Sequence, residues 1–274
     1  MDPFSLTFSP ADHAAQKSHF QLTFLFVPSH QRRQALADLY AFCRLADDIA
    51  DQPDLEISFR KSRIAQLRGW VLAKEAVGHP FWDRFLKERN RYQIDDQSLL
   101  GVLDGVLKDI EQRTFKTWTE LDEYVYGVAC CVGEAVLCIV GANEGTSAKN
   151  YAYEMGRCLQ YLNIMRDLEE DHANGRLYVP QEFMHSLDSQ LDENERLQKI
   201  RDELYRRALL FKASARPYSL RCVIAELMAG LYLEASKSYW RWGNPRRLSK
   251  AEKIYFSLKT LVQFIFRRPI SFSI

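Results

Sequence analysis

The chain of 274 residues is poor in glycine and proline, with 12 and 9 respectively, and its charges nearly cancel. The low glycine and proline content excludes a collagenous or low-complexity chain. No proline occurs between Pro80 and Pro180, which leaves room for long helices. With 37 Lys and Arg against 36 Asp and Glu, the formal net charge is +1. A general nucleic-acid binder would need a basic excess, so we expect no nucleic-acid partner.

Three further sequence signals are absent. None of the six cysteines forms a C-x-x-C pair, so we expect neither a zinc site nor a disulfide framework, but buried free thiols in a reducing cytoplasm. The N-terminus lacks the basic and apolar regions of a signal peptide. No uninterrupted apolar run reaches the roughly 18 residues of a membrane span. These absences predict a cytoplasmic protein.

Apolar residues recur at spacings of three and four, which is the helical period. Two such stripes are Leu36, Leu39, Tyr40 and Cys43, and Leu99, Leu103, Val106 and Leu107. Alternating, strand-like runs are scarce, although residues 176–180 could form a short extended piece. No repeat and no linker rich in Pro, Gly or Ser divides the chain. The sequence therefore predicts a single all-α domain over residues 1–274.

The first acidic pair, Asp47 and Asp51, continues the stripe that begins at Leu36. Residues four apart lie on one face of a helix, one turn from each other. Because the stripe is predicted to face the interior, both carboxylates should face it too. Like charges at this spacing repel, and their burial costs more still, so a cation must compensate. Arg44 is close enough along the helix to pair with Asp47; the alternative is an exposed acidic helix end before Pro53.

A second helix repeats the arrangement. At about 100° per residue, Asn163, Asp167, Glu170 and Asp171 fall within roughly one quarter of the helix circumference, and an apolar stripe again leads into them. Two distant helices with the same D-x-x-x-D spacing indicate acidic clusters that face each other inside a bundle.

Oxygen ligands without Cys or His suit a hard cation, above all Mg²⁺. Protein-bound Mg²⁺ usually keeps several waters and is completed by substrate phosphates. Arg44 and Arg166 precede the carboxylates within about one turn and could grip phosphate oxygens. The alternative for each is an i,i+3 salt bridge with its own Asp, as between Arg44 and Asp47. The pattern predicts a substrate that carries a diphosphate.

The sequence between the two clusters is apolar and aromatic. Small side chains at residues 128–133 could let a hydrocarbon lie close to the backbone, and aromatic faces could stabilise a carbocation in a dry pocket. A diphosphate at one end and a hydrocarbon at the other describe an isoprenoid diphosphate. The predicted lining comprises Phe20, Phe24, Phe26, Tyr40, Phe42, Tyr124 and residues 128–133.

At these residues the chain resembles the squalene/phytoene synthase family. The matching blocks run in the family's order over roughly residues 16–255. They are Tyr40-Ala-Phe-Cys-Arg44 with Asp47-Asp48-Ile-Ala-Asp51, residues 124–133, Gln160-Tyr-Leu-Asn163-Ile-Met-Arg166-Asp167 through Asp171, Asn174-Gly-Arg-Leu-Tyr-Val-Pro180 and, more loosely, Tyr232-Leu-Glu234 and residues 246–253.

The resemblance implies an isoprenoid synthase helical bundle with a central cavity, Mg²⁺, and head-to-head condensation of two prenyl diphosphates. We expect farnesyl diphosphate as the substrate and presqualene diphosphate as the product. Squalene, dehydrosqualene and phytoene remain alternatives. The sequence has no G-x-G-x-x-G nucleotide-binding motif. This absence does not exclude the use of NADPH, because the reductive members of the family lack a Rossmann site too.

The resemblance also implies residue roles. Asp47 and Asp51 resemble the family's first metal-binding pair, and Asn163, Asp167 and Asp171 resemble the second. The four aspartates and Tyr232 are the expected catalytic residues. The expected substrate-binding residues are Ser18, Tyr40, Arg44, Gln160, Arg166 and Tyr232. Ser18 stands in Gln16-Lys-Ser-His19-Phe20, which departs from the Ser-x-Ser-Phe-like run that contacts the second diphosphate in the family.

Two other function classes fit parts of the sequence. A di-iron protein needs E-x-x-H pairs, and Glu169-x-x-His172 and Glu182-x-x-His185 have that form but flank a turn. A non-enzymatic prenyl-binding module would explain an apolar cavity but not two acidic clusters.

The last part of the chain is amphipathic. Residues 254–266 are followed by Arg267 and Arg268, and such a stretch could lie on a membrane surface. The alternative is a final helix packed on the bundle.

Overall fold

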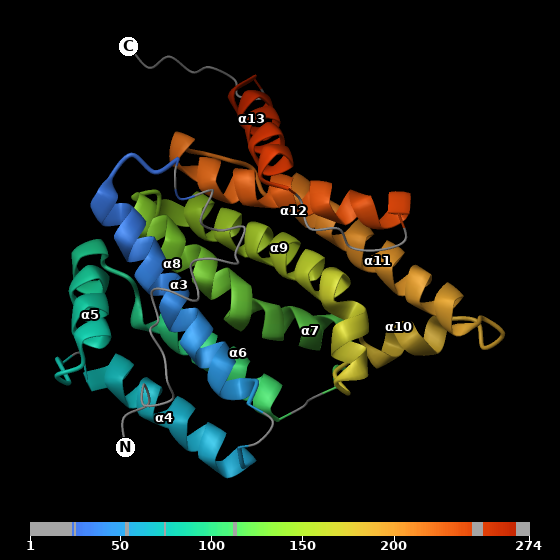
Figure 1. The fold of residues 1–274 in the computed structure, drawn as a ribbon, viewed down its shortest axis with the longest axis horizontal. Helices are drawn as coiled ribbons and strands as arrows, with labels where there is room; N and C mark the ends of the chain where they lie inside the picture. The colour runs from blue at the N-terminus through green and yellow to red at the C-terminus, as the bar shows by residue number, and fades with distance from the viewer. Residues whose placement is uncertain are drawn as a thin grey trace.

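The computed structural model describes Phe24 and residues 26–52, 55–73, 75–111, 114–242 and 249–266. Every regular element within these ranges is helical, which confirms the predicted all-α class (Figure 1). Residues 176–180 follow an irregular path and do not form a strand. The elements are α3 (His30–Ala50), α4 (Ile57–Ala73), α5 (Pro80–Tyr92), α6 (Asp96–Ile110), α7 (Trp118–Val125), the π-helix η1 (Tyr126–Cys130), α8 (Cys131–Val140), α9 (Gly145–Ala173), α10 (Gln181–Ser186), α11 (Glu193–Ser214), the 3₁₀-helix η2 (Leu220–Cys222), α12 (Val223–Trp242) and α13 (Lys250–Phe266).

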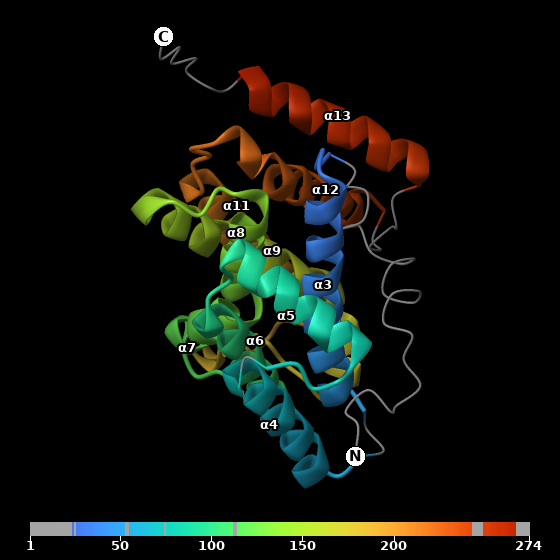
Figure 2. The same cartoon turned by 90° about the vertical axis from the view of Figure 1, so that its left-hand side faces the viewer.

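The long helix α9 is central to the packing. It contacts α8, η1, α11 and α12, while α3 packs against α4, α5, α6 and α8 (Figures 1 and 2). Both predicted apolar stripes face the interior, and Leu36, Leu39, Leu99 and Leu103 are all buried. Because α3 and α9 are held by the same core, their ends are fixed relative to each other.

Residues 118–140 form one continuous helix through α7, η1 and α8. Among the described residues it alone is long and apolar enough to cross a membrane, and half of its most apolar stretch is buried. It packs against α6 and α9, so it is a core helix of the bundle. Glycines permit the close approach, since a Cβ on Gly127 would lie 2.7 Å from the carbonyl oxygen of Gly101, and one on Gly156 would lie 2.7 Å from Cα of Cys130.

The two ends of α3 are held by side chains. Ser29 caps the first turn by accepting a hydrogen bond from the backbone N–H of Arg32. At the other end the guanidinium of Arg60 donates to the carbonyl oxygen of Ala50 at 2.6 Å. This contact satisfies an otherwise unpaired carbonyl and fixes the turn from which Asp47 projects.

The six cysteines are free, as predicted, and Cys130, Cys131, Cys158 and Cys222 are buried. Burial raises the pKa of Cys131 and of Cys158 to about 12. These thiols therefore stay protonated and behave as small apolar side chains.

Helix α13 packs on α12 at the edge of the molecule (Figure 2). Phe264 and Ser257 are buried, whereas Ile254, Tyr255 and Leu258 are exposed. Lys250–Phe266 thus form a helix packed on the bundle by one side, while its other side stays exposed, and Arg267 and Arg268 lie outside the described residues.

Candidate active site

Three helices end with acidic side chains in their last two turns. Asp47 lies near the end of α3, Asp109 near the end of α6, and Asp167 and Asp171 near the end of α9. Helices α3 and α9 run in the same direction in Figure 1. The C-terminus of a helix carries a partial negative charge, which disfavours acidic side chains there. Carboxylates at three such ends create a strongly negative site that suits a bound cation.

Arg176 joins the two predicted acidic clusters. Its guanidinium donates to Oδ1 of Asp51 at 2.8 Å, and its backbone N–H donates to the carbonyl oxygen of Asp171 at 2.8 Å. Asp51 and Asp171 therefore lie on either side of one arginine, although 120 positions separate them in the sequence. The predicted meeting of the two acidic segments is confirmed.

Asp109 is a third acidic centre that the sequence interpretation missed. It accepts hydrogen bonds from the hydroxyl of Tyr178 at 2.7 Å and from that of Tyr124 at 3.1 Å. Burial raises the pKa of Asp109 to about 6, although the two tyrosines and Arg176 oppose the rise. The available signal was weak: a lone Asp three positions after Val106 on an otherwise apolar helix face.

The carboxylates of the site influence one another. The Asp47 side chain is reached by solvent, yet the surrounding protein, together with Asp109 and Asp51, raises its pKa to about 7. Burial and the charge of Asp167 raise the pKa of Asp171 to about 6, and Asp109 adds to this rise. Because Asp109 acts on both Asp47 and Asp171, the carboxylates form one electrostatic unit with excess negative charge.

Each of the two predicted phosphate-binding arginines has an acidic partner. Arg166 donates to both carboxylate oxygens of Asp167, at 2.6 and 2.5 Å, so its partner is the adjacent residue and not one at the predicted i,i+3 spacing. Arg44 pairs with Asp48 at 2.7 Å. The predicted pair of Arg44 with Asp47 is therefore wrong: the partner is Asp48, at the i,i+4 spacing that a helix allows equally well.

The remaining predicted residues lie around this cluster. Asn163 donates through Nδ2 to Oε1 of Gln160 at 3.3 Å, and its Oδ1 is buried without a hydrogen-bond donor. The Arg166 guanidinium lies 5.5 Å from the centre of the Tyr232 ring. Burial raises the pKa of Tyr232, and the nearby Tyr40 adds to this rise. Ser18 lies outside the described residues.

Parts of the predicted hydrocarbon lining were wrong. Phe42 is fully buried and stacks on Phe85 with ring centres 5.2 Å apart, so it belongs to the core. Phe26 borders a separate cavity beside Val27 and Leu220. A Cβ on Gly133 would lie 3.3 Å from the carbonyl oxygen of Ala152, so helix packing occupies that space. The predicted central cavity and the lining role of Phe20, which is not among the described residues, stay predictions.

The donor set fits a cation that is only partly coordinated by protein. Among the described residues, no three His, Cys, Asp or Glu side chains stand close enough to form a closed metal cage. Mg²⁺ needs only one or two carboxylates when substrate phosphates complete its shell. A cation bound by oxygen ligands would lower the raised pKa of Asp47. It would also give the unpaired Oδ1 of Asn163 a partner.

The di-iron alternative does not fit the described contacts. Glu169 accepts from Arg201 at 2.6 Å, and Glu182 accepts from the backbone N–H of Trp118 at 2.7 Å. The two E-x-x-H glutamates thus serve separate structural contacts instead of sharing a metal.

The chain is similar to several known proteins over most of its length. A family model described as squalene/phytoene synthase matches residues 13–236. Presqualene diphosphate synthase of Zymomonas mobilis subsp. mobilis is 30% identical over 261 residues, which cover 88% of this chain and 87% of that relative. A 4,4'-diapophytoene synthase of Staphylococcus haemolyticus is 30% identical over 180 residues, covering 65% of this chain and 63% of that relative. The crystal structure of a dehydrosqualene synthase in complex with ligand shares the fold, with a TM-score of 0.77 at 21% identity over 97% of this chain and 100% of that one.

Proposed function

Because the chain belongs to the squalene/phytoene synthase family, we propose that it joins two molecules of farnesyl diphosphate head to head and forms presqualene diphosphate. As a member of this family it is a prenyltransferase that condenses prenyl diphosphates. The relative from Zymomonas mobilis bears the name of this product, which supports the finer assignment. We also propose that residues 1–274 act as one condensing domain.

The contact between Arg176 and Asp51 carries the proposal. It brings the end of α3 to the segment after α9, so that both acidic clusters can act on one diphosphate. A prenyl-binding module would have no use for this concentration of carboxylates, whereas a reaction that expels diphosphate needs cations held close to the leaving group.

We propose Mg²⁺ as the cation, held by Asp47 and Asp51 on one side and by Asn163, Asp167 and Asp171 on the other. When bound, Mg²⁺ would withdraw negative charge from the departing diphosphate. The unpaired Oδ1 of Asn163 supports its assignment as an oxygen ligand.

The protein's arginines would bind and orient the diphosphate. Arg44 and Arg166 each have a carboxylate partner on their own helix, and Arg176 has Asp51. Phosphate oxygens compete for the same guanidinium donors, so binding of the substrate would loosen these pairs and free Asp51 and Asp167.

Tyr40, Gln160 and Tyr232 are the proposed substrate contacts beside the arginines. Tyr232 lies against Arg166, and burial keeps its phenol protonated by raising its pKa. A neutral ring at this place could also face a developing carbocation without quenching it. Ser18 keeps its proposed role at the second substrate.

Incubation of the purified protein with farnesyl or geranylgeranyl diphosphate, each with and without Mg²⁺ and NADPH, tests the proposal. We expect Mg²⁺-dependent formation of presqualene diphosphate from farnesyl diphosphate, identified by mass spectrometry. Conversion of geranylgeranyl diphosphate alone would favour phytoene synthesis, and squalene formed only with NADPH would add a reductive step. Release of diphosphate from neither substrate would favour a prenyl-binding module.

We further propose that this is a cytoplasmic enzyme that touches the membrane through α13. Ile254, Tyr255 and Leu258 are 55%, 62% and 52% exposed on that helix, and Lys259 lies beside them with 43% of its side chain exposed. An apolar face with a lysine beside it suits an anionic lipid surface. Flotation with anionic vesicles should carry the protein upward, and Leu258→Asp should reduce this; a protein that stays unbound would reject the membrane contact.

A further inference from the structure

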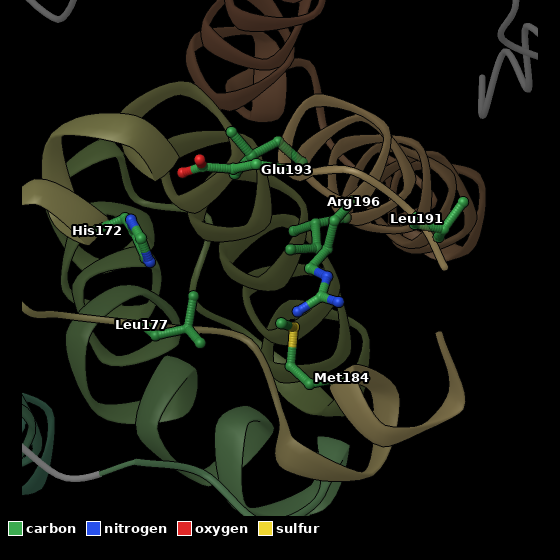
Figure 3. A pocket seen from close by; sticks show the side chains of 8 residues that line it. His172, Leu177, Met184, Leu191, Glu193 and Arg196 are labelled. Atoms are coloured by element: carbon green, nitrogen blue, oxygen red, sulfur yellow. The ribbon is translucent and has the colours of Figure 1, made fainter. Parts of the chain in front are cut away.

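A second candidate binding site lies on the other side of the segment that carries Asp171 and Arg176. A cavity of about 400 Å³, partly open to solvent, is lined by the end of α9 and the segment after it, α10 and the first turns of α11 (Figure 3). Its volume lies within the range of small-molecule sites, roughly 300–1,000 Å³. The lining residues are His172, Leu177, Met184, Leu191, Glu193, Arg196, Leu197 and Ile200.

The lining is apolar apart from three side chains. Arg196 projects its guanidinium toward Met184, while the carboxylate of Glu193 points away from it (Figure 3). His172 lies on the same side as Glu193 in that view. The apolar wall and the cationic group thus share one part of the cavity.

Arg196 makes no side-chain hydrogen bond or ion pair within the described part of the chain, and its Nε is buried without an acceptor. Nε of Arg201 on the same helix also lacks an acceptor, but Arg201 pairs with Glu169 through a terminal nitrogen, and Arg206 and Arg207 both pair with Glu203. A guanidinium without an anion in an apolar cavity points to a ligand that supplies one, because charge-assisted hydrogen bonds to arginine are among the strongest in proteins.

We propose that this cavity binds a small amphiphilic anion. Its apolar chain would lie against Leu177, Met184, Leu197 and Ile200, and its carboxylate or phosphate head would accept hydrogen bonds from the terminal nitrogens of Arg196. The proposal does not depend on the prenyl transfer reaction.

The cavity adjoins the segment that carries active-site residues. His172 directly follows Asp171, and Leu177 lies between Arg176, which holds Asp51, and Tyr178, which holds Asp109. A ligand that packs against Leu177 therefore supports or shifts the residues on both sides of it, so occupancy would alter prenyl transfer.

Decyl phosphate, decanoate and decanol test the proposal as probes of one chain length. Binding is followed by NMR of ¹³C-labelled methionine methyl groups, with the Met184 signal identified from Met184→Leu. Because Met184 lines this cavity, its signal reports binding there and not at the diphosphate site. Decyl phosphate should shift it in a saturable way, and decanol should bind at least about tenfold more weakly.

Arg196→Gln should raise the dissociation constant of decyl phosphate about tenfold. Arg206→Gln, the same change on an exposed part of α11, should leave it within about twofold. If Arg196→Gln does not fold, Arg196→Lys keeps the charge and should weaken binding about threefold by losing the planar fork.

The outcomes separate the ligand sources. Binding of decyl phosphate alone supports a phosphate head, and binding of decanoate as well supports any oxyanion. A Met184 signal that does not move, equal binding of decanol, or an unchanged constant in both Arg196 variants would overturn the proposal.

Discussion

Arg176 donates to the carboxylate of Asp51 at 2.8 Å, across 125 positions of the sequence. Its backbone N–H also donates to Asp171, so a single residue holds the ends of α3 and α9 together. The site is therefore kept assembled by protein contacts before any substrate arrives, and removal of this arginine should affect both acidic clusters.

The variant Arg176→Gln tests this. It should lower kcat/KM for farnesyl diphosphate about 100-fold, because misplacement of catalytic groups by about 1 Å has effects of that size. Steady-state diphosphate release measures it. Arg206→Gln removes a surface ion pair on α11 and should leave kcat/KM within about twofold, and an equal loss in the two variants would contradict the assembling role of Arg176.

The carboxylates on each side should contribute separately to metal binding. Asp47→Asn and Asp167→Asn should each lower activity on the order of 100-fold or more, and should raise the Mg²⁺ concentration needed for half-maximal rate. Titration of activity with Mg²⁺ gives both quantities. Asp104→Asn is the matched control, since Asp104 is exposed and pairs only with Arg68 in the described contacts. An unchanged Mg²⁺ requirement in the two variants would argue against metal ligation by these groups.

The sequence was sufficient to predict the helices and the two acidic clusters. The period of Leu36, Leu39 and Tyr40 determines which face of α3 is buried. Asp47 continues that face near the end of the helix, where its side chain is reached by solvent and not enclosed in the interior as predicted. Such local patterns are encoded within a few turns of one helix, so they can be found without knowledge of tertiary structure.

Contacts between distant segments could not be predicted in the same way. The partner of Arg176 depends on how the turn after α9 folds back, and the sequence showed only Asn174 and Gly175 as turn residues. The role of Asp109 depends on Tyr124 and Tyr178, which donate hydrogen bonds to it from two other segments of the chain. The sequence around Asp109 contains neither tyrosine. The aromatic character of Phe42 predicted a place in the cavity lining. It does not reveal that Phe85 packs against the ring, which makes Phe42 a core residue.

Stability and activity should depend on pH in opposite ways. The pKa of Asp109 is about 6 in the fold and 3.8 in an ordinary environment, so the folded state keeps a proton between these values that the unfolded chain releases. Stability contributed by this group is complete below about pH 4 and is lost as the pH rises through 6. Activity should rise over the same interval and up to about 7, the pKa of Asp47, because ionised carboxylates bind metal.

The variant Asp109→Asn isolates this group. In the presence of a chelator, it should be more stable than the parent at pH 8, by at most about 3 kcal/mol, and should show a smaller change in melting temperature between pH 5 and pH 8. Asn still offers a carbonyl oxygen to Tyr124 and Tyr178. Melting curves that keep the parent's full pH dependence would mean that Asp109 is not the titrating group.

The close contact of α9 with η1 predicts a stability effect outside the site. A Cβ on Gly156 would lie 2.7 Å from Cα of Cys130 and 2.8 Å from its backbone nitrogen. These are backbone atoms and cannot rotate away, so Gly156→Ala must push the two helices apart and should destabilise the fold by about 1–3 kcal/mol. Gly69 is also inside a helix but has nothing within 4 Å of such a Cβ, so Gly69→Ala should stabilise by about 0.5–1 kcal/mol. Urea unfolding of the two variants measures both changes. Equal effects would mean that α9 and η1 are less tightly packed than this contact requires.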